Sequence, residues 1–171
     1  NELMHAYSQG ELKMEDYMAF SLEPLIGRTP EEVEHLVGPW VEDFIEPIIF
    51  SDATKTVATH RKAGDRILII SASGVHLVKP IAERLGIDEV LGIELEVAHG
   101  AYTGNTVGTL TYREGKITRL LEWLDEQEEN LEGASFYSDS RNDLPLLLKV
   151  DHPHVVNPDP VLREHAEKAG W

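Results

Sequence analysis

The chain has 171 residues, of which 42% are hydrophobic and none is cysteine. This length supports one hydrophobic core, or a core with a small second lobe, and the composition excludes a disordered chain, a disulfide framework and a thiolate metal site. The 31 acidic and 15 basic residues give a formal net charge of −16, which disfavours nucleic acid and anionic membrane surfaces as partners because both are negatively charged.

The sequence carries no sign of membrane insertion. No apolar run approaches the roughly 20 residues that a membrane-spanning helix needs, and no signal-peptide pattern opens the chain. We therefore predict a cytoplasmic protein. A small anionic ligand stays compatible with the negative charge, since a bound divalent cation inverts the sign locally. The first residue is Asn1 rather than Met, and a helical pattern begins at once, so we expect the chain to start within a longer protein.

Residues 1–47 are predicted to be helical throughout. Residues 2–25 carry apolar side chains at helical spacing. The next helix begins with Thr29 as its N-cap residue and Pro30 at its first position, and the pair Gly38-Pro39 is expected to interrupt or kink it. We interpret the aromatic side chains of this region as helix packing. These are Tyr7, Tyr17, Phe20, Trp40 and Phe44.

From Ser51 onward, helices are predicted to alternate with strands. Residues 52–63 form an amphipathic helix, and the continuous apolar run Ile67–Ile70 is typical of a strand buried on both faces. The remaining expected elements are a helix, a hairpin, a helix, a strand, a helix, a short strand and a final helix. Their sequences are VHLVKPIAERLG, EVLGIELEVAHGAYTGNTVGTLTY, EGKITRLLEWLDEQ, SFYSD, DLPLLLKV, HVVNPD and PVLREHAEKAG. This alternation indicates crossover connections, a parallel sheet and the α/β class.

Three polar clusters follow predicted strands. They are SASG at 71–74, the segment 139–143, and NPDP at 157–160. Ligands of open α/β sheets bind beyond the carboxyl ends of the strands, so the clusters are candidates for one site. Each cluster alone is more typical of a strand-to-helix turn, where Ser, Asp and Asn cap helices. Three clusters together, one of them with an acidic pair, favour a functional site.

The acidic pair Asp139 and Asp143 suits a hard cation. Two carboxylates held close together repel, and one pKa would rise unless a cation compensated them. Mg²⁺ takes oxygen ligands, often one or two carboxylates with waters and a substrate phosphate. The pair therefore predicts a Mg²⁺ site at the end of the strand SFY.

The residues around Ser71 suit a phosphate group. We expect the Ser71 hydroxyl and the backbone amides of Ala72 and Ser73 to lie at the N-terminus of the following helix. Anions bind favourably at such a position. Lys116 begins another helix and could reach a phosphate as a point charge. A lone lysine is more often a solvated surface residue, so Lys116 by itself is a weak indication.

These motifs resemble a known family. From RILIISAS to YSDSRNDLPLL, over residues 48–160, the chain resembles the haloacid dehalogenase superfamily and, within it, the phosphoserine phosphatase-like branch. The earlier helices resemble the helical cap of that branch, and GAYTGNTVG resembles its flap-like hairpin. The resemblance implies a Rossmann-like three-layer core with a parallel sheet at 48–171, plus a small helical cap at 1–47.

The resemblance also implies roles for single residues. Ser71 matches the second motif of the family, whose hydroxyl binds the phosphoryl group, and Lys116 in REGKITRL matches the third, which neutralises nucleophile and phosphate. The backbone amides of Ala72 and Ser73 are candidates for the same phosphate because of their expected place at a helix N-terminus. These two residues and Lys116 would thus form a phosphate-binding set with Ser71.

The segment YSDSRNDLPLL matches the fourth motif, usually Gly-Asp-Gly-x-x-Asp, with Ser138 and Ser140 in place of the glycines. The match implies that Asp139 coordinates Mg²⁺ and that Asp143 completes or supports the metal shell. Asn142, within the same motif, is expected at the substrate phosphate. This motif is the most specific of the three, since it combines an acidic pair, an asparagine and a helix.

One motif of the family is missing. Its members begin with a strand ending Asp-x-Asp-x-Thr, whose first Asp attacks phosphorus and whose second acts as general acid and base. Asp52 follows an apolar run, but Ala53 and Thr54 do not supply the second acid. We therefore expect either that an N-terminal segment precedes Asn1 or that the chain is a degenerate relative.

The predicted function is a Mg²⁺-dependent phosphomonoesterase that hydrolyses a small phosphorylated metabolite through an aspartyl-phosphate. Phosphoserine and histidinol phosphate are candidate substrates. A catalytically inactive relative that serves as a binding module is the alternative, favoured by the missing Asp-x-Asp. A doubly wound signalling domain is a third possibility. Against it stand the late position of the acidic pair and the helical lobe that precedes the sheet.

Overall fold

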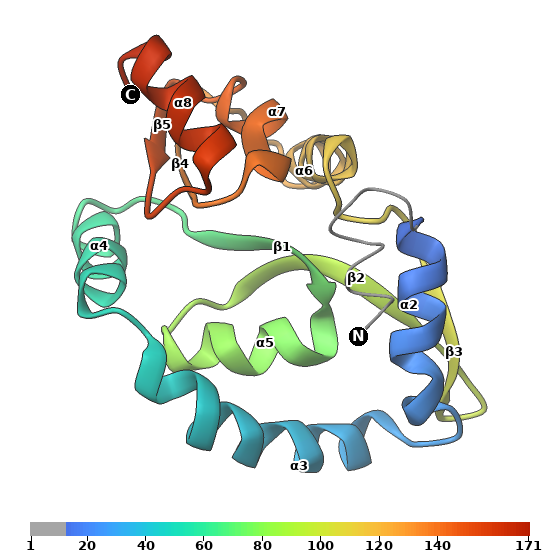
Figure 1. Ribbon diagram of the computed structural model, residues 1–171. Coiled ribbons are helices and arrows are strands. Elements are labelled where there is room, and N and C mark those ends of the chain that lie inside the picture. Colours follow the sequence, from blue (N-terminus) through green and yellow to red (C-terminus); the bar gives the residue numbers. More distant parts are fainter. Residues whose placement is uncertain (1–12) are drawn as a thin grey trace. The chain divides into compact units, whose positions relative to one another are not determined.

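A computed structural model describes residues 13–171, and the chain divides into two compact units, Asn1–Leu110 and Thr111–Trp171. Figure 1 labels the elements along the chain. The expected helix over residues 2–25 lies partly outside the described residues. Among the helices that the structure describes, none combines the length and the apolar character needed to cross a membrane. The division after Leu110 differs from the predicted boundary between cap and core at 47/48, which remains a prediction.

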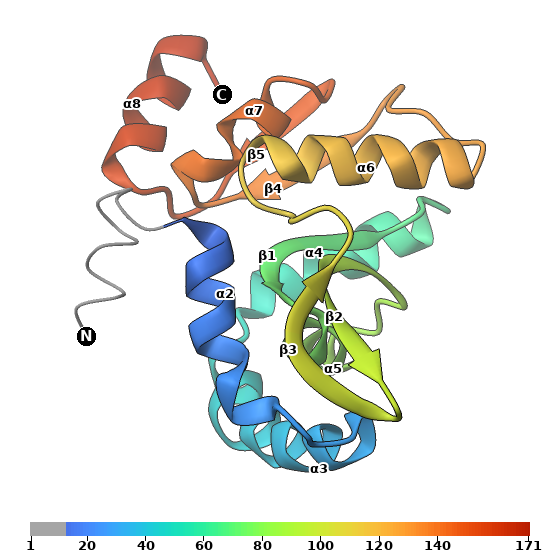
Figure 2. The ribbon, with the colours of Figure 1, turned by 90° about the vertical axis from the view of Figure 1, so that its right-hand side faces the viewer.

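The first unit contains helices and a three-stranded sheet. Its elements are α2 (Met14–Leu22), the 3-10 turn η1 (Glu23–Leu25), α3 (Pro30–Trp40), the π-helical turn η2 (Val41–Ile45), the 3-10 turn η3 (Glu46–Ile48), α4 (Ser51–Lys62), β1 (Leu68–Gly74), α5 (Val75–Arg84), β2 (Glu89–Ala98) and β3 (Ala101–Val107). The sheet has the order β1-β2-β3. β1 and β2 are parallel and joined through α5, while β2 and β3 form an antiparallel hairpin beside α2 (Figure 2).

Helix α3 begins as the sequence predicts. The Thr29 hydroxyl accepts a hydrogen bond from the backbone N–H of Glu32 at 3.1 Å, and the Glu32 carboxylate accepts one from the N–H of Thr29 at 2.9 Å. This reciprocal capping box satisfies two N–H groups that the helix leaves without internal partners. Pro39 lies inside α3 without interrupting it. The irregularity follows the proline instead, where η2 widens into a π-helical turn.

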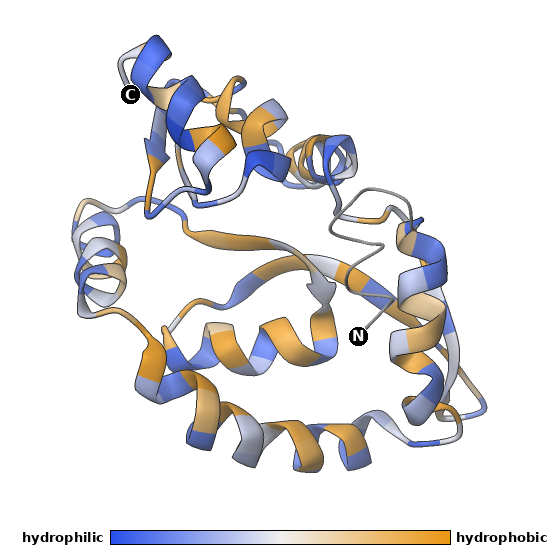
Figure 3. Cartoon of the chain, in the orientation of Figure 1, coloured by the Kyte–Doolittle hydropathy of each residue, from blue (hydrophilic) through white to orange (hydrophobic). Residues whose placement is uncertain are grey.

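The core of the first unit joins the N-terminal helices to the sheet. Its buried centre consists of Val33, Val37 and Val41, and the partly buried side chains packed against it are Leu25, Ile45, Leu77, Ile81 and Tyr102. Apolar residues recur along both α3 and α5 (Figure 3). The helices predicted as a cap therefore share a hydrophobic core with α5 and β3.

The predicted packing of the aromatic residues is wrong for three of them, and Tyr7 lies outside the described residues. Phe20, Trp40 and Phe44 are 51%, 41% and 65% exposed. The buried stripe of α3 and η2 runs through Val33 and Val41 at a spacing of four residues. Trp40 precedes Val41 by one position, which places its side chain about 100° around the helix from that stripe. Helical spacing alone did not say which of two neighbouring stripes is buried.

The hairpin of β2 and β3 contains a bulge. Pairing changes register between Leu95 and Val97, so that Glu96 faces three residues of β3. The Glu96 Oε1 atom accepts hydrogen bonds from Thr103 Oγ1 at 2.8 Å and from Asn105 Nδ2 at 3.3 Å. These bonds, from Thr103 first and then from Asn105, lower the pKa of Glu96 and outweigh the small opposite effect of burial.

We expect the contribution of Glu96 to stability to disappear in acid. Because its folded-state pKa lies below the ordinary 4.5, the stabilisation is present above that pH and is lost as the pH falls through the folded value. Thermal unfolding of the wild type and of Glu96→Gln, measured from about pH 6 to about pH 3.5, should show a difference that shrinks with acidity. A difference independent of pH would contradict this expectation.

The second unit contains a two-stranded parallel sheet and helices. Its elements are α6 (Glu114–Glu126), β4 (Ser135–Ser138), the 3-10 turn η4 (Arg141–Asp143), α7 (Leu144–Leu147), β5 (His152–Val155) and α8 (Pro160–Ala169). Pairing of β4 with β5 runs from Ser135 opposite His152 to Ser138 opposite Val155. Its buried apolar side chains are Leu120, Trp123, Leu124, Leu146, Leu147, Leu162 and Ala166.

The predicted α/β class is confirmed. Both parallel pairs, β1 with β2 and β4 with β5, are connected through helices, as crossover units require. In the described part of the chain these pairs belong to two separate sheets rather than to one. The candidate residues other than Lys116 were placed by the sequence at or just beyond the carboxyl ends of β1 and β4.

Candidate functional site

The segment after Ile70 differs from its prediction. The sequence suggested that Ala72 and Ser73 stand at a helix N-terminus, but β1 extends through Gly74 and α5 begins at Val75. Gly74 pairs with Ile93 of β2 after a register shift. The placement of the two amides at the start of a helix is therefore wrong, because pairing with β2 prolongs the strand.

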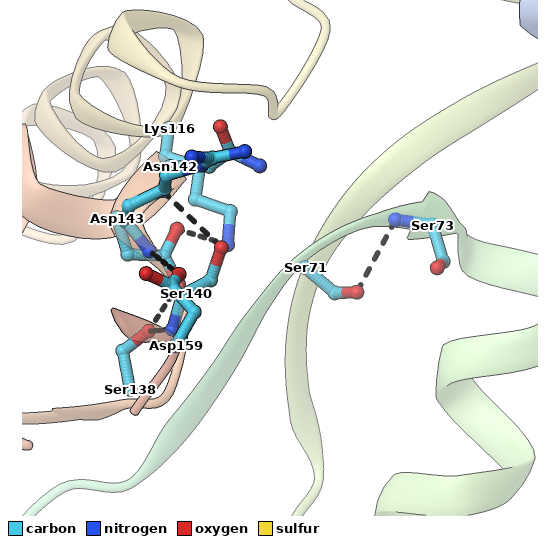
Figure 4. A network of polar contacts seen from close by, with 9 residues as sticks. Ser71, Ser73, Lys116, Ser138, Ser140, Asn142, Asp143 and Asp159 are labelled. Carbon is cyan, nitrogen blue, oxygen red and sulfur yellow. Dashed lines mark hydrogen bonds and ion pairs between the residues drawn. The ribbon is translucent and has the colours of Figure 1, made fainter. Parts of the chain in front are cut away.

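A glycine on β2 permits this close pairing. A Cβ atom on Gly92 would lie 3.0 Å from the carbonyl oxygen of Ser73 and 3.1 Å from a methyl group of Val75. Any side chain at position 92 would therefore crowd the junction of β1 and α5, and glycine avoids this crowding. Within the irregular stretch, the N–H of Ser73 donates to Ser71 Oγ at 3.2 Å (Figure 4). The Ser71 hydroxyl oxygen therefore lies close to the backbone amide two residues further along the chain.

Lys116 forms a buried ion pair in the second unit. Its Nζ atom lies 2.6 Å from Oδ1 of Asp143, and the two side chains are 9% and 10% exposed. The Ser138 hydroxyl donates to Oδ2 of Asp143 at 2.6 Å. Lys116 projects from the first turn of α6, Ser138 ends β4, and Asp143 closes η4 (Figure 4). Oδ2 of Asp143 therefore accepts a hydrogen bond, while buried Oδ1 is compensated by the charge of Lys116.

Two serine hydroxyls organise the loop after β4. The N–H of Ser140 donates to Ser138 Oγ at 3.1 Å, and the N–H of Asn142 donates to Ser140 Oγ at 3.2 Å. The N–H of Asp143 also donates to the carbonyl oxygen of Ser140 at 3.0 Å. The hydroxyls thus satisfy amides of a loop that makes a tight turn. Side chains at these two positions contribute bonds that glycines would not supply.

Asp139 is the exposed member of the acidic pair. Its carbonyl oxygen accepts a hydrogen bond from the N–H of Asp159 at 3.0 Å. Within residues 13–171, no side chain donates a hydrogen bond to its carboxylate. The same part of the chain holds no group of three or more His, Cys, Asp or Glu side chains arranged for a metal ion. A cation at this loop would be held by the Asp139 carboxylate with water molecules as further ligands, which is a common arrangement for Mg²⁺.

Asp159 has contacts that the sequence did not reveal. Burial alone would raise the pKa of its carboxyl group. Hydrogen bonds from the backbone N–H groups of Leu162, Arg141 and Val161, together with the Arg141 charge, outweigh burial and lower that pKa. The helix-start pattern DPVL signals an N-cap residue. By contrast, no local sequence pattern signals the hydrogen bond that Asp159 accepts from the N–H of Arg141, 18 residues earlier.

The candidate residues thus fall into two groups. Ser71, Ala72 and Ser73 lie in the first unit, and all the others lie in the second. The structure brings Lys116 and Asp143 into direct contact. Asp139 and Asn142 belong to the same loop as Asp143.

The profile of the haloacid dehalogenase-like hydrolases matches residues 2–148. The chain belongs to this family. The resemblance inferred from the motifs around Ser71, Lys116 and Asp139 is thereby confirmed at the level of the family.

Several named relatives of this haloacid dehalogenase-like chain are phosphatases. A histidinol-phosphatase of Neisseria meningitidis is 39% identical over 169 residues, which cover 96% of this chain and 76% of that protein. The phosphoserine phosphatase SerB1 of Mycobacterium tuberculosis is 32% identical over 145 residues, covering 85% of this chain but 47% of that protein. The chain therefore spans about three quarters of one relative and about half of the other.

Solved structures share the fold. A protein of unknown function from Bordetella pertussis has a TM-score of 0.93 at 36% identity, over 99% of this chain and 78% of that chain. A substrate-bound phosphoserine phosphatase has a TM-score of 0.64 at 21% identity, over 95% of this chain and 74% of that chain. The second likeness concerns the fold alone. The family and the names of its phosphatase members support an enzyme that hydrolyses phosphate esters.

Proposed function

We propose that the protein containing this chain is a Mg²⁺-dependent phosphomonoesterase that acts on a small phosphorylated metabolite through an aspartyl-phosphate. The observation that carries the proposal is the buried pair of Lys116 and Asp143 beside the exposed carboxylate of Asp139. A buried lysine held by one carboxylate, next to a second carboxylate that has no side-chain partner among residues 13–171, suits a phosphate with its counter-ion.

In this proposal Asp139 holds the metal ion and Asp143 supports the site. A bound Mg²⁺ would neutralise charge that develops on the phosphoryl oxygens. Asp143 has both carboxylate oxygens engaged, by Lys116 and by Ser138. We therefore assign Asp143 a supporting role through its charge and through the orientation of Lys116.

Lys116 and Ser71 are proposed to bind the phosphoryl oxygens. The ammonium group of Lys116 is fixed before substrate arrives, so it stabilises a developing negative charge without having to reorient. The Ser71 hydroxyl can donate one hydrogen bond, and the amides of Ala72 and Ser73 and the Asn142 side chain are further candidate donors. The nucleophile is an Asp of an Asp-x-Asp-x-Thr motif, which the 171 residues do not contain.

The names of the relatives support a substrate class, the phosphate esters of small metabolites. Histidinol phosphate is our first candidate, because the relative named histidinol-phosphatase shares 39% identity over 96% of this chain. Phosphoserine is the second. A different candidate function is a binding module that retains the phosphate site without catalysis. Phosphate release from either ester by the full-length protein would exclude that alternative.

Replacing Asp139 tests the proposed metal site. In the full-length protein, Asp139→Asn should reduce Mg²⁺-dependent phosphate release by at least about 10²-fold, because an amide binds a hard cation far more weakly than a carboxylate. Asp125→Asn, at an exposed position of α6, is the matched control and should leave release unchanged. Undiminished release by Asp139→Asn would refute the assignment.

A further inference from the structure

We propose that Asp159 is a positioning residue that holds the loop of Asp139 in the conformation that binds the cation. Neither the motifs nor the relatives assign this role. The inference rests on the proposed function, since it assumes that Asp139 is a Mg²⁺ ligand. The group that acts is the Asp159 carboxylate, which connects the loop after β4 to the start of α8.

Contacts between the two strand ends continue beyond the sheet. Regular pairing ends with Ser138 opposite Val155. The N–H of Val156 then donates to the carbonyl oxygen of Ser138 at 2.9 Å, and the N–H of Asp159 donates to that of Asp139 at 3.0 Å. The backbone of the 156–159 segment therefore follows the loop through the position of the proposed ligand.

The side chain of Asp159 adds a second point of attachment. Its Oδ2 atom accepts a hydrogen bond from the N–H of Arg141 at 2.6 Å. One residue thus bonds the loop at Asp139 through its backbone and at Arg141 through its side chain. Two bonds that flank Ser140 restrict the backbone torsions from which the Asp139 side chain projects.

The other oxygen of the same carboxylate is tied to a helix. Oδ1 accepts a hydrogen bond from the N–H of Leu162 at 2.9 Å, which makes Asp159 the N-cap residue of α8. Leu162 is fully buried. The carboxylate therefore bridges a surface loop and a helix that is anchored in the core of the second unit.

This bridge matters because Asp139 has little else to orient it. Its side chain is exposed, and no side chain of residues 13–171 bonds to its carboxylate. The direction of a metal ligand then depends on its backbone, and groups that hold ligands in place affect metal affinity by about 10–100-fold when they are replaced. We expect Asp159 to influence cation binding in this way without contacting the cation.

Asparagine at position 159 separates this role from helix capping. Asn caps helices about as well as Asp, so the bond to Leu162 can be kept. A carboxamide has only one acceptor oxygen, and its NH₂ group would face the N–H of Arg141, so that the second bond is lost. Asp159→Asn thus breaks the bridge while it leaves α8 capped.

The test is a calorimetric Mg²⁺ titration of the full-length protein without substrate, alongside urea unfolding. We expect the Kd for Mg²⁺ to rise about tenfold in Asp159→Asn with little change in the unfolding midpoint. Glu167→Gly, at an exposed position of α8, is the control. It weakens the helix without touching the loop and should leave the Kd unchanged.

The outcomes separate this inference from the proposed function. If Asp139→Asn binds Mg²⁺ like the wild type, the proposed metal site itself is refuted. If Asp139→Asn loses binding while Asp159→Asn stays within about twofold of the wild type, only the positioning role is refuted. A Glu167→Gly variant that weakens binding as much as Asp159→Asn would also overturn it, because general loosening of α8 would then explain the effect.

Discussion

Lys116→Met should destabilise the protein by about 3–5 kcal/mol and lower kcat by at least about 10²-fold. The stability loss follows from burial. Removal of the ammonium group leaves the Asp143 carboxylate, which is 10% exposed, with the Ser138 hydroxyl as its remaining side-chain partner. The activity loss follows from the proposed role of Lys116, because a methionine of similar length has no charge to offer the phosphate. Urea unfolding and phosphate release measure the two effects.

A double variant distinguishes the two effects. Replacing a whole buried ion pair with apolar residues is often neutral or stabilising, since neither charge then needs to be removed from water. Lys116→Met combined with Asp143→Leu should therefore recover much of the lost stability while activity stays absent. Lys149→Met, at an exposed position, is the control and should change the unfolding free energy little. Destabilisation by Lys116→Met no greater than that by Lys149→Met would contradict the assigned role of the buried pair.

The parts of the fold that the sequence predicted correctly have strong local signals. Thr29 is the N-cap residue of α3 and Pro30 its first residue, as expected, and Asp159 followed by Pro160 marks the start of α8. The apolar run that begins near Ile67 becomes β1, and EGKITRLLEWLDEQ becomes α6. Each signal depends on side chains within one or two turns of the element, which is the range over which propensity and capping act.

The structural features that the sequence did not predict depend on contacts between distant segments of the chain. The continuation of β1 through Gly74 requires β2 to approach at Gly92, 18 positions later. The bond from Arg141 to Asp159 likewise spans 18 residues. The burial of Val41 rather than Trp40 is decided by α5 and β3, which pack on one side of α3 and η2. No local pattern contains this information.

In the candidate site, too, the sequence indicated local motifs but not the tertiary contacts between them. The motif around Asp139 indicated that this loop carries the chemistry, and the structure places Asp143 of that loop against Lys116. The sequence alone offered no reason to pair Asp143 with Lys116 rather than with a metal ion. Their contact depends on α6 packing beside α7, which is a tertiary arrangement. This contact is the reason why we propose a role for Asp143 that differs from that of Asp139.

Gly92→Val should destabilise the protein by about 1–3 kcal/mol and also reduce phosphatase activity. A Cβ at position 92 would lie 3.0 Å from the Ser73 carbonyl oxygen, and the two further methyl groups of valine enlarge the overlap. The atom it meets belongs to the backbone, so the strain cannot be relieved by rotating a side chain. The backbone of 71–73 must shift, and the hydrogen bond between Ser73 N–H and Ser71 Oγ shifts with it.

Two further variants show which contact causes the effect. Val75→Ala in the Gly92→Val background removes the methyl group at 3.1 Å but leaves the Ser73 oxygen in place, so we expect it to restore only part of the activity. Gly38→Ala is the control, because nothing lies within 4 Å of a Cβ there and alanine favours a helix. Full recovery in the double variant would mean that the approach of β2 constrains α5 rather than the segment of Ser71. Partial recovery of activity would instead connect the fit of Gly92 against Ser73 to the position of the proposed phosphate ligand.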